Sequence, residues 1–149
     1  MPEARAAASN CVFCKIRDGA IPAMKVYEDD RTFCIMDINP LNEGHCLVIT
    51  KAHAPTIFET ETKDLQAAIA TAKKVAIALL RAVKMDGLNM LQANGAAAFQ
   101  SVPHYHLHLI PRWKNDGRGF DWKLVPGDRD AIVSVGERLR AVLGGHDHD

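Results

Sequence analysis

The chain has 149 residues, the size of one ordinary domain with its own hydrophobic core. Its 18 basic and 18 acidic side chains cancel, so it lacks the basic excess that neutralises the phosphates of long nucleic acid. No apolar run approaches the roughly 20 residues that cross a bilayer, and the first ten residues lack the hydrophobic stretch of an export signal. We therefore expect a cytoplasmic protein with a small-molecule partner, and neither long nucleic acid nor a membrane.

Strand-like segments open the ordered part of the chain. Residues 24–28 and 31–37 are strand-like and meet at Asp29-Asp30, which suggests a hairpin. Residues 45–50 form a third short apolar strand. These segments predict one edge of an antiparallel sheet.

The clearest helix is predicted from Thr62 to Met85, and Gly87 follows at a place where helices commonly end. Its apolar residues recur at three- and four-residue steps and form one stripe. They are Leu65, Ala68, Ile69, Ala72, Ala76, Leu79, Leu80 and Val83.

The remaining elements complete the fold prediction. Residues 88–92 and 104–110 read as two more strands, and residues 129–143 as a last helix. Five strands and two helices in this order predict an α+β domain with an antiparallel sheet. We expect one domain over residues 11–143, between a flexible leader at 1–10 and a flexible tail at 144–149.

Three histidines alternate in the segment His104-Tyr105-His106-Leu107-His108. Successive side chains of a strand point to opposite faces, so the three imidazoles are expected to share one face. A solvent-exposed face that happens to be rich in histidine is the bland alternative, but strict alternation is an unusual accident.

The histidine row could hold a metal or perform catalysis. A strand rises ~3.3 Å per residue, so His104 and His108 stand about 13 Å apart, whereas zinc lies ~2 Å from each ligand nitrogen. All three rings cannot reach one ion, although two with outside help still could. Neutral imidazole is a good nucleophile and exchanges protons readily, and rings ~6.6 Å apart can serve a phosphorus atom and its leaving group. The geometry favours catalysis.

A loop of small residues at 94–103 precedes the histidine row. Small side chains let backbone N–H groups approach an anion, and Gln100 and Ser101 add side-chain donors. Such a loop is often only a turn, but its position here predicts a phosphate cradle.

The segment His104–Ile110 matches the His-φ-His-φ-His-φ-φ motif of the histidine triad family, in which φ is apolar. Over roughly residues 11–112 the chain resembles that family's Hint-like branch. The further matches, in order, are Cys11-Val-Phe-Cys14-Lys-Ile16, Ile21-Pro22, Val26-Tyr-Glu-Asp29, Met36-Asp-Ile-Asn-Pro40, Gly44-His45, Leu47-Val48-Ile49 and Asn94-Gly95 followed by Gln100-Ser101. The resemblance implies a five-stranded antiparallel sheet with two helices, usually paired into a homodimer.

The resemblance also implies an activity. In the family the middle histidine attacks an α-phosphorus, a role that falls on His106, and His108 contacts the phosphate and leaving group together with Gln100 and Ser101. The expected enzyme is a nucleotide hydrolase or nucleotidyl transferase that cleaves purine nucleoside phosphoramidates or related conjugates through a nucleotidyl-histidine intermediate. A dimeric purine-nucleotide-binding module with little turnover is the alternative.

Further residues resemble the family's nucleotide contacts. Asp37 matches the ribose contact, although an aspartate before Asn-Pro is also common in turns. The other expected nucleotide-binding residues are Phe13, Ile16, Ile35, Ile38, Leu47, Asn94 and Val102. For the apolar ones, a plain core role is the alternative.

The pair Cys11 and Cys14 has three possible roles. A redox motif normally opens a helix in a thioredoxin-like unit, which this pattern lacks. The thiols could be loosely placed, or they could be half of a structural zinc site. The resemblance favours zinc, with His53 and His104 as the other two ligands of a closed tetrahedral site.

The remaining cysteines and one further histidine have simpler interpretations. Cys34 and Cys46 lie in apolar stretches and are expected in the core. His45 is interpreted as a residue at the start of a strand rather than as a ligand.

Two positions depart from the family pattern. Ala93 stands where many relatives have an asparagine, and Phe99 replaces a glycine that often precedes the glutamine. The phosphate cradle therefore has one donor fewer and is bulkier. The sequence accordingly does not identify the leaving group of the substrate.

Overall fold

A computed structural model describes residues 10–120 and 122–145. The chain divides into two compact units between Arg118 and Gly119. The first unit holds the sheet, and the second holds α4 (Arg129–Gly144). The predicted leader, apart from Asn10, and the predicted tail beyond Gly145 lie outside the described residues. The single domain over 11–143 stays a prediction.

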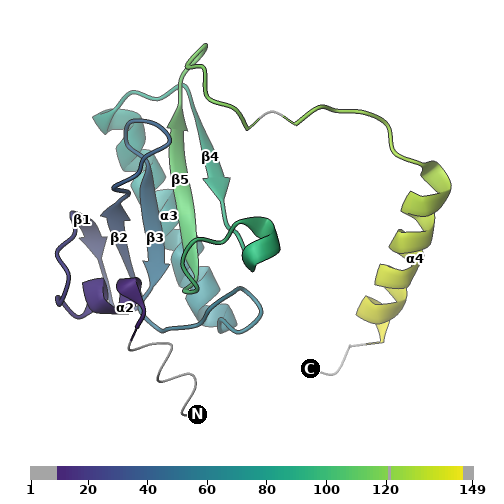
Figure 1. The fold of residues 1–149 in the computed structure, drawn as a ribbon, viewed down its shortest axis with the longest axis horizontal. Coiled ribbons are helices and arrows are strands. Elements are labelled where there is room, and N and C mark those ends of the chain that lie inside the picture. Colours follow the sequence, from purple (N-terminus) through teal and green to yellow (C-terminus); the bar gives the residue numbers. More distant parts are fainter. Residues whose placement is uncertain (1–9, 121, 146–149) are drawn as a thin grey trace. The chain divides into compact units, whose positions relative to one another are not determined.

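One five-stranded sheet forms the centre of the first unit, with the strand order β1-β2-β3-β5-β4 and antiparallel pairing throughout (Figure 1). The strands are β1 (Lys25–Glu28), β2 (Thr32–Met36), β3 (Cys46–Thr50), β4 (Gly87–Leu91) and β5 (His106–Arg112). The predicted α+β class and antiparallel sheet are confirmed.

The predicted hairpin between β1 and β2 is confirmed, and Asp29 holds its turn. One oxygen of this carboxylate accepts hydrogen bonds of 2.9 Å from the backbone N–H groups of Arg31 and Thr32. An aspartate that binds backbone N–H groups two and three residues ahead favours a turn over a continued strand.

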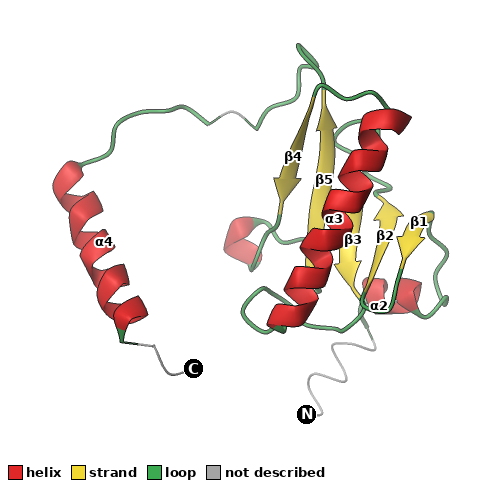
Figure 2. Ribbon diagram, turned by 180° about the vertical axis from the view of Figure 1, so that it is seen from behind, coloured by secondary structure: helices red, strands yellow, loops and turns green. Residues whose placement is uncertain are grey.

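A different helix packs against each face of the sheet, the long α3 along one face and the short α2 against part of the other (Figures 1 and 2). On one face, α3 (Thr62–Ala82) packs Ala68, Ala72, Val75 and Leu79 against Cys34, Cys46, Val48, Leu107 and Leu109. On the other face, α2 (Val12–Arg17) packs Phe13, Cys14 and Ile16 against Phe33, Ile35, Leu47 and Ile49. The core role predicted for Cys34 and Cys46 is confirmed, since both are buried.

The predicted end of the long helix is wrong. The helix ends at Ala82 instead of Met85, and Gly87 already belongs to β4, opposite Arg112. The chain leaves the helical path at Lys84, whose φ of +53° is left-handed. The reversal is therefore complete before Gly87 is reached.

Two further boundaries differ from the sequence prediction. The helix α2 was not predicted, because six residues are too few for helical periodicity to be visible. The strand β5 starts at His106 rather than His104 and continues to Arg112. The first histidine of the row thus precedes the strand, where its N–H donates to the Val102 carbonyl at 2.8 Å.

The last helix agrees with its prediction to within one residue. Its first turn is capped by Asp128, whose carboxylate accepts from the backbone N–H of Ala131 at 3.0 Å. No helix among residues 10–120 and 122–145 is long and apolar enough to cross a membrane.

Gly44, just before β3, provides a test of the packing. Its φ is +83°, and an added Cβ would lie 3.0 Å from Cγ of Pro111. Gly19 has a φ of +81° with nothing within 4 Å of an added Cβ. Gly19→Ala should therefore cost only the left-handed strain of about 1–2 kcal/mol. We expect Gly44→Ala to cost about 1–3 kcal/mol more, because it also overpacks.

Urea unfolding of the two variants measures this difference. Equal losses of stability would contradict the close approach of Gly44 to β5.

Candidate functional site

The ring of His106 is held in one tautomer by the backbone. Its Nδ1 lies 2.7 Å from the carbonyl oxygen of His104. A carbonyl can only accept, so Nδ1 carries the proton and Nε2 keeps its lone pair. Burial lowers the pKa of His106 below its ordinary value, which keeps the ring neutral at pH 7. Phe13 packs edge-on against it, with ring centroids 4.9 Å apart.

His108 is oriented by a second histidine, His45. The backbone N–H of Leu41 donates to His45 Nδ1 at 2.9 Å, so the proton of the neutral ring is on Nε2. That Nε2 lies 2.9 Å from His108 Nδ1 and 3.4 Å from a carboxylate oxygen of Asp37. His108 Nδ1 therefore accepts, and the His108 proton is on Nε2.

The two neighbouring rings of β5 are both neutral. Burial, together with the nearby His106 and His45, lowers the pKa of His108 to about 4. The His106 and His108 ring centroids are 5.0 Å apart. A ring with its lone pair on Nε2 thus neighbours a ring with its proton on Nε2. That the two act as nucleophile and proton donor stays a prediction.

His45 is a site residue that sequence reasoning missed. It lies immediately before β3, as predicted, but its ring contacts His108 across the sheet. The contact between His45 and His108 follows from the pairing of β3 with β5, which sets Leu47 opposite His108. Without that register, the motif Gly44-His45 reads only as the start of a strand.

A pocket of about 310 Å³ opens beside these rings. Its lining includes His106, His108 and most of the predicted nucleotide-binding residues, namely Phe13, Ile16, Ile35, Asp37, Ile38, Leu47, Ser101 and Val102. The volume is at the lower end of the range for small-molecule sites. A mainly apolar wall with a few polar groups suits one flat, heteroatom-bearing ligand.

Asp37 lies at the edge of this pocket with most of its side chain covered. One carboxylate oxygen accepts from the backbone N–H of Asn39 at 2.8 Å, and the other faces His45. The turn role and the ligand role considered for Asp37 are therefore compatible, because a carboxylate can accept several hydrogen bonds.

Two predicted nucleotide contacts, Asn94 and Gln100, lie outside the pocket lining. The side-chain oxygen Oδ1 of Asn94 accepts from the backbone N–H of Ile57 at 2.7 Å. The Gln100 amide accepts from Gly95 N–H at 2.7 Å and donates to the Pro55 carbonyl at 2.6 Å. Both side chains tie the loop at 94–102 to the loop after β3. Their contact with a nucleotide stays a prediction.

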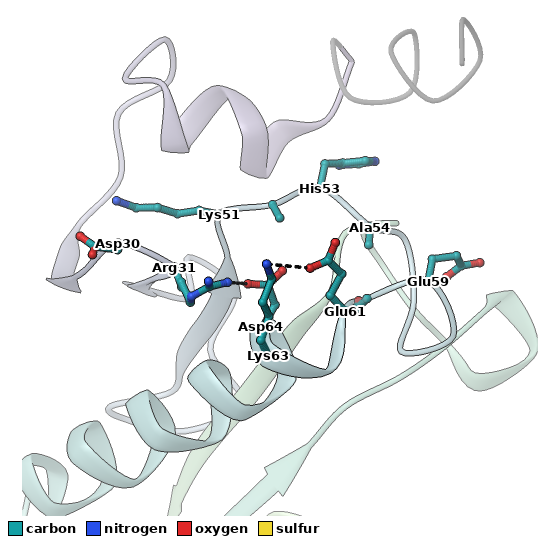
Figure 3. A pocket seen from close by; sticks show the side chains of 11 residues that line it. Asp30, Arg31, Lys51, His53, Ala54, Glu59, Glu61, Lys63 and Asp64 are labelled. Atoms are coloured by element: carbon teal, nitrogen blue, oxygen red, sulfur yellow. Dashed lines mark hydrogen bonds and ion pairs between the residues drawn. The ribbon is translucent and has the colours of Figure 1, made fainter. Parts of the chain in front are cut away.

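A larger hollow of about 550 Å³ lies at the start of α3 (Figure 3). Its lining is mostly charged, and two ion pairs lie within it. Arg31 binds Asp64 at 2.8 Å, and Lys63 binds Glu61 at 3.3 Å. None of the β5 histidines lines it. The smaller apolar pocket is therefore the candidate site.

Cys11, Cys14, His53 and His104 converge in the first unit, as the family resemblance implied, with their ligand-type atoms within 4.8 Å of one another. The distance from His104 Nδ1 is 3.3 Å to Cys11 Sγ, 3.6 Å to Cys14 Sγ and 3.1 Å to His53 Nδ1. Around a tetrahedral zinc, ligand pairs are about 3.6 Å apart for sulfur and nitrogen and about 3.3 Å apart for two nitrogens. The donor set fits that ion.

The surroundings of these ligands fit a cation as well. His104 Nε2 donates to the Thr50 carbonyl at 2.6 Å, which leaves Nδ1 without a proton and available as a ligand. Burial and the neighbouring Cys11 raise the pKa of Cys14 to about 11. A divalent cation binds thiolates and neutral imidazoles together, and so offsets the free-energy cost of deprotonating Cys14.

A second cluster, Asp37, His45 and His108, also brings ligand-type atoms within 4.8 Å. Its hydrogen bonds do not suit a metal. The Leu41 N–H occupies His45 Nδ1, so His45 Nε2 carries the proton and has no lone pair to offer. This cluster is a hydrogen-bond chain, which weakens the alternative of a metal held by two histidines of the row.

Residues 18–115 match the family model described as the HIT domain. The chain belongs to the HIT family. It is 44% identical over 108 residues to adenylylsulfatase HINT3 of Arabidopsis thaliana, and this stretch is 72% of the chain but 55% of that relative. It is 37% identical over 138 residues to adenosine 5'-monophosphoramidase HNT1 of Saccharomyces cerevisiae, or 92% of the chain and 85% of the relative.

A solved structure of a HIT relative is also similar. The Zn-bound histidine triad family protein from Mycobacterium smegmatis superimposes with a TM-score of 0.73 at 36% identity, over 94% of this chain and 97% of that one. The match to the family model begins at Asp18 and does not include Cys11 and Cys14. Their position beside His53 and His104 is known from this structure.

The hydrogen bonds predict the tautomers of the three histidines of the row. At neutral pH we expect the proton on Nε2 of His104 and His108 and on Nδ1 of His106. Long-range proton–nitrogen correlation spectra of the ¹⁵N-labelled protein distinguish these forms. A proton on Nε2 of His106 would contradict the geometry, and His45→Phe should remove the preference at His108 while leaving that of His106.

Proposed function

We propose that this HIT protein is a nucleotide hydrolase or nucleotidyl transferase that acts on purine nucleoside phosphoramidates or related conjugates through a nucleotidyl-histidine intermediate. The observation that carries the proposal is the neutral His106, whose Nε2 lone pair is at a pocket with an adjacent N–H donor. Relatives named as an adenylylsulfatase and an adenosine 5'-monophosphoramidase support chemistry of this kind.

In the first step, His106 Nε2 attacks the α-phosphorus and forms an N–P bond while the bond from phosphorus to the leaving group breaks. The anionic phosphate favours a charged ring nearby and so raises the pKa of His108 in the complex. A proton taken up from solvent on substrate binding makes the ring cationic, and His108 then gives its Nε2 proton to the departing amine and returns to its neutral form. The carbonyl of His104, which accepts from Nδ1, stabilises the positive charge that develops on His106.

In the second step, water attacks the phosphorus and the N–P bond breaks. The water proton passes to His108, and the nucleoside monophosphate leaves with His106 restored. The Ser101 hydroxyl and the His108 N–H are two side-chain donors in the pocket lining that suit phosphoryl oxygens.

The pocket lining supports a purine nucleotide as the bound part of the substrate. Phe13, Ile16, Ile35 and Leu47 offer an apolar wall to a flat base. The carboxylate of Asp37 can accept hydrogen bonds from both ribose hydroxyls. The neutral net charge supports a small nucleotide rather than long nucleic acid, and a cytoplasmic location stays a prediction.

We also propose that Cys11, Cys14, His53 and His104 hold a structural Zn²⁺. When bound, the ion supplies folding free energy and takes no part in the reaction. It joins α2 to the residue that precedes β5, so His104 is a positioning residue whose ring is unavailable for acid–base work.

A homodimer is the proposed assembly. Among the described residues the outer strand β4 has a strand partner on one side alone, and Met90 and Leu91 on it are exposed. A strand edge of this kind is a ready site for pairing with a second copy.

The zinc proposal predicts a metal content that depends on the cluster cysteines. We expect about one zinc per chain in the wild type and in Cys34→Ala, which removes a buried thiol outside the cluster. We expect almost none in Cys14→Ala. Elemental analysis of the purified proteins measures this. A Cys14→Ala variant with wild-type zinc would contradict the proposed ligand set.

The catalytic proposal predicts a covalent adduct. Rapid quenching of the wild type with adenosine phosphoramidate should leave one adenylyl group on His106, seen by mass spectrometry. We expect His106→Ala to lose more than about a thousandfold in kcat/KM, because alanine offers no lone pair to phosphorus.

Calorimetry with adenosine monophosphate checks that the pocket of this variant is intact. An active His106→Ala variant would overturn the mechanism. Tight monophosphate binding by the wild type without turnover of any conjugate would favour a binding module.

A further inference from the structure

Phe99 has an unusual conformation and position for a large aromatic residue. Its φ is +63°, in the left-handed region that bulky side chains rarely adopt. Its side chain is 92% exposed, so it contributes nothing to the core of the first unit. Neither backbone preference nor burial therefore accounts for phenylalanine at this position.

The loop around Phe99 is held firmly by hydrogen bonds. The residue ends the short 3₁₀ turn Ala96–Ala98, and its N–H donates to the Ala96 carbonyl at 3.0 Å. The Gln100 side chain, which bonds both Gly95 and Pro55, fastens the loop on its other side. The backbone thus fixes where the aromatic ring emerges.

Phe99 lies two residues from the lining of the pocket. Phe99 is two residues before Ser101, which lines the pocket with His106 and His108. Their Cα atoms can be at most about 7.6 Å apart, since consecutive Cα atoms are ~3.8 Å apart. A side chain of this size on such a loop can reach the space just outside the pocket.

That space is where a leaving group has to lie. A pocket of about 310 Å³ has room for one small ligand moiety, so the nucleotide of a conjugate fills it. Because Ser101, a proposed phosphate donor, borders this loop, we expect the group bonded to the phosphorus to extend toward it. The neighbouring Ala96, Ala97 and Ala98 add no charge there, and the surface offered to the leaving group is apolar.

We propose that Phe99 forms one wall of a leaving-group subsite and favours conjugates whose leaving group carries a flat aromatic or apolar surface. The proposal rests on the proposed function and adds a specificity to it. Stacking of a leaving group on an exposed aromatic ring corresponds to a roughly threefold to tenfold preference.

The test compares two substrates of each enzyme. Adenosine phosphoramidates of ammonia and of a naphthyl-bearing amine differ only in the leaving group. We expect the ratio of their kcat/KM values, naphthyl over ammonia, to fall threefold to tenfold in Phe99→Gly and to be kept in Phe99→Trp. Lys84→Gly is the matched control, since Lys84 is also left-handed, with a φ of +53°, and lies on the loop after α3.

The control separates relief of backbone strain from loss of the ring. Both glycine variants should resist urea better than the wild type, because glycine adopts positive φ without strain. Only Phe99→Gly should change the substrate ratio. An unchanged ratio in Phe99→Gly, or an equal change in Lys84→Gly, would overturn the proposal.

Two further outcomes are informative. If Phe99→Gly turns a dimer into a monomer in sedimentation, the ring belongs to an interface and the subsite is wrong. If the wild type cleaves neither substrate, the proposed function fails. The role of Phe99 is then tested by binding: the ratio of the dissociation constants of the two intact conjugates is compared between the wild type and the same variants.

Discussion

The hydrogen bond from His106 Nδ1 to the carbonyl of His104 is the interaction on which the site depends. A neutral imidazole has one proton and one lone pair, so a fixed acceptor at Nδ1 leaves the lone pair on Nε2, the atom that we propose as the nucleophile. Burial keeps the ring uncharged, and Phe13 restricts its rotation. No carboxylate is needed to set the tautomer, because the backbone of the same strand segment does so.

Residue 104 joins the two halves of the site. Its carbonyl orients His106, while its ring lies among Cys11, Cys14 and His53 and donates to Thr50. A metal ion bound by that cluster would therefore also fix the backbone that orients His106. The carbonyl of His104 fixes the tautomer of His106. In the same way, His45 fixes the tautomer of His108 by donating to its Nδ1, and the backbone N–H of Leu41 fixes the tautomer of His45. The site thus contains two short hydrogen-bond chains, one ending at His106 and the other at His108. Each chain determines whether Nε2 of that ring has a lone pair or a proton.

Much of this arrangement could be predicted from the sequence, because strand alternation and helical periodicity are local patterns. Such patterns predict the sheet and the long helix, whereas the convergence of Cys11, Cys14, His53 and His104 is an expectation that only the family resemblance supplies. The helix end was misplaced because a left-handed lysine, rather than Gly87, reverses the chain. The role of His45 depends on the register of β3 against β5, which no local pattern encodes. The loop bonds of Asn94 and Gln100 depend on the same kind of tertiary contact.

The most direct test of the account is a crystal structure of the protein with a non-hydrolysable purine nucleotide conjugate. The account predicts His106 Nε2 about 3–3.5 Å from the α-phosphorus and in line with the bond to the leaving group. It also predicts the His108 Nε2 proton directed at the phosphate or the leaving atom. A nucleotide bound with its phosphorus far from the ring of residue 106, or on the α3 face of the sheet, would contradict it.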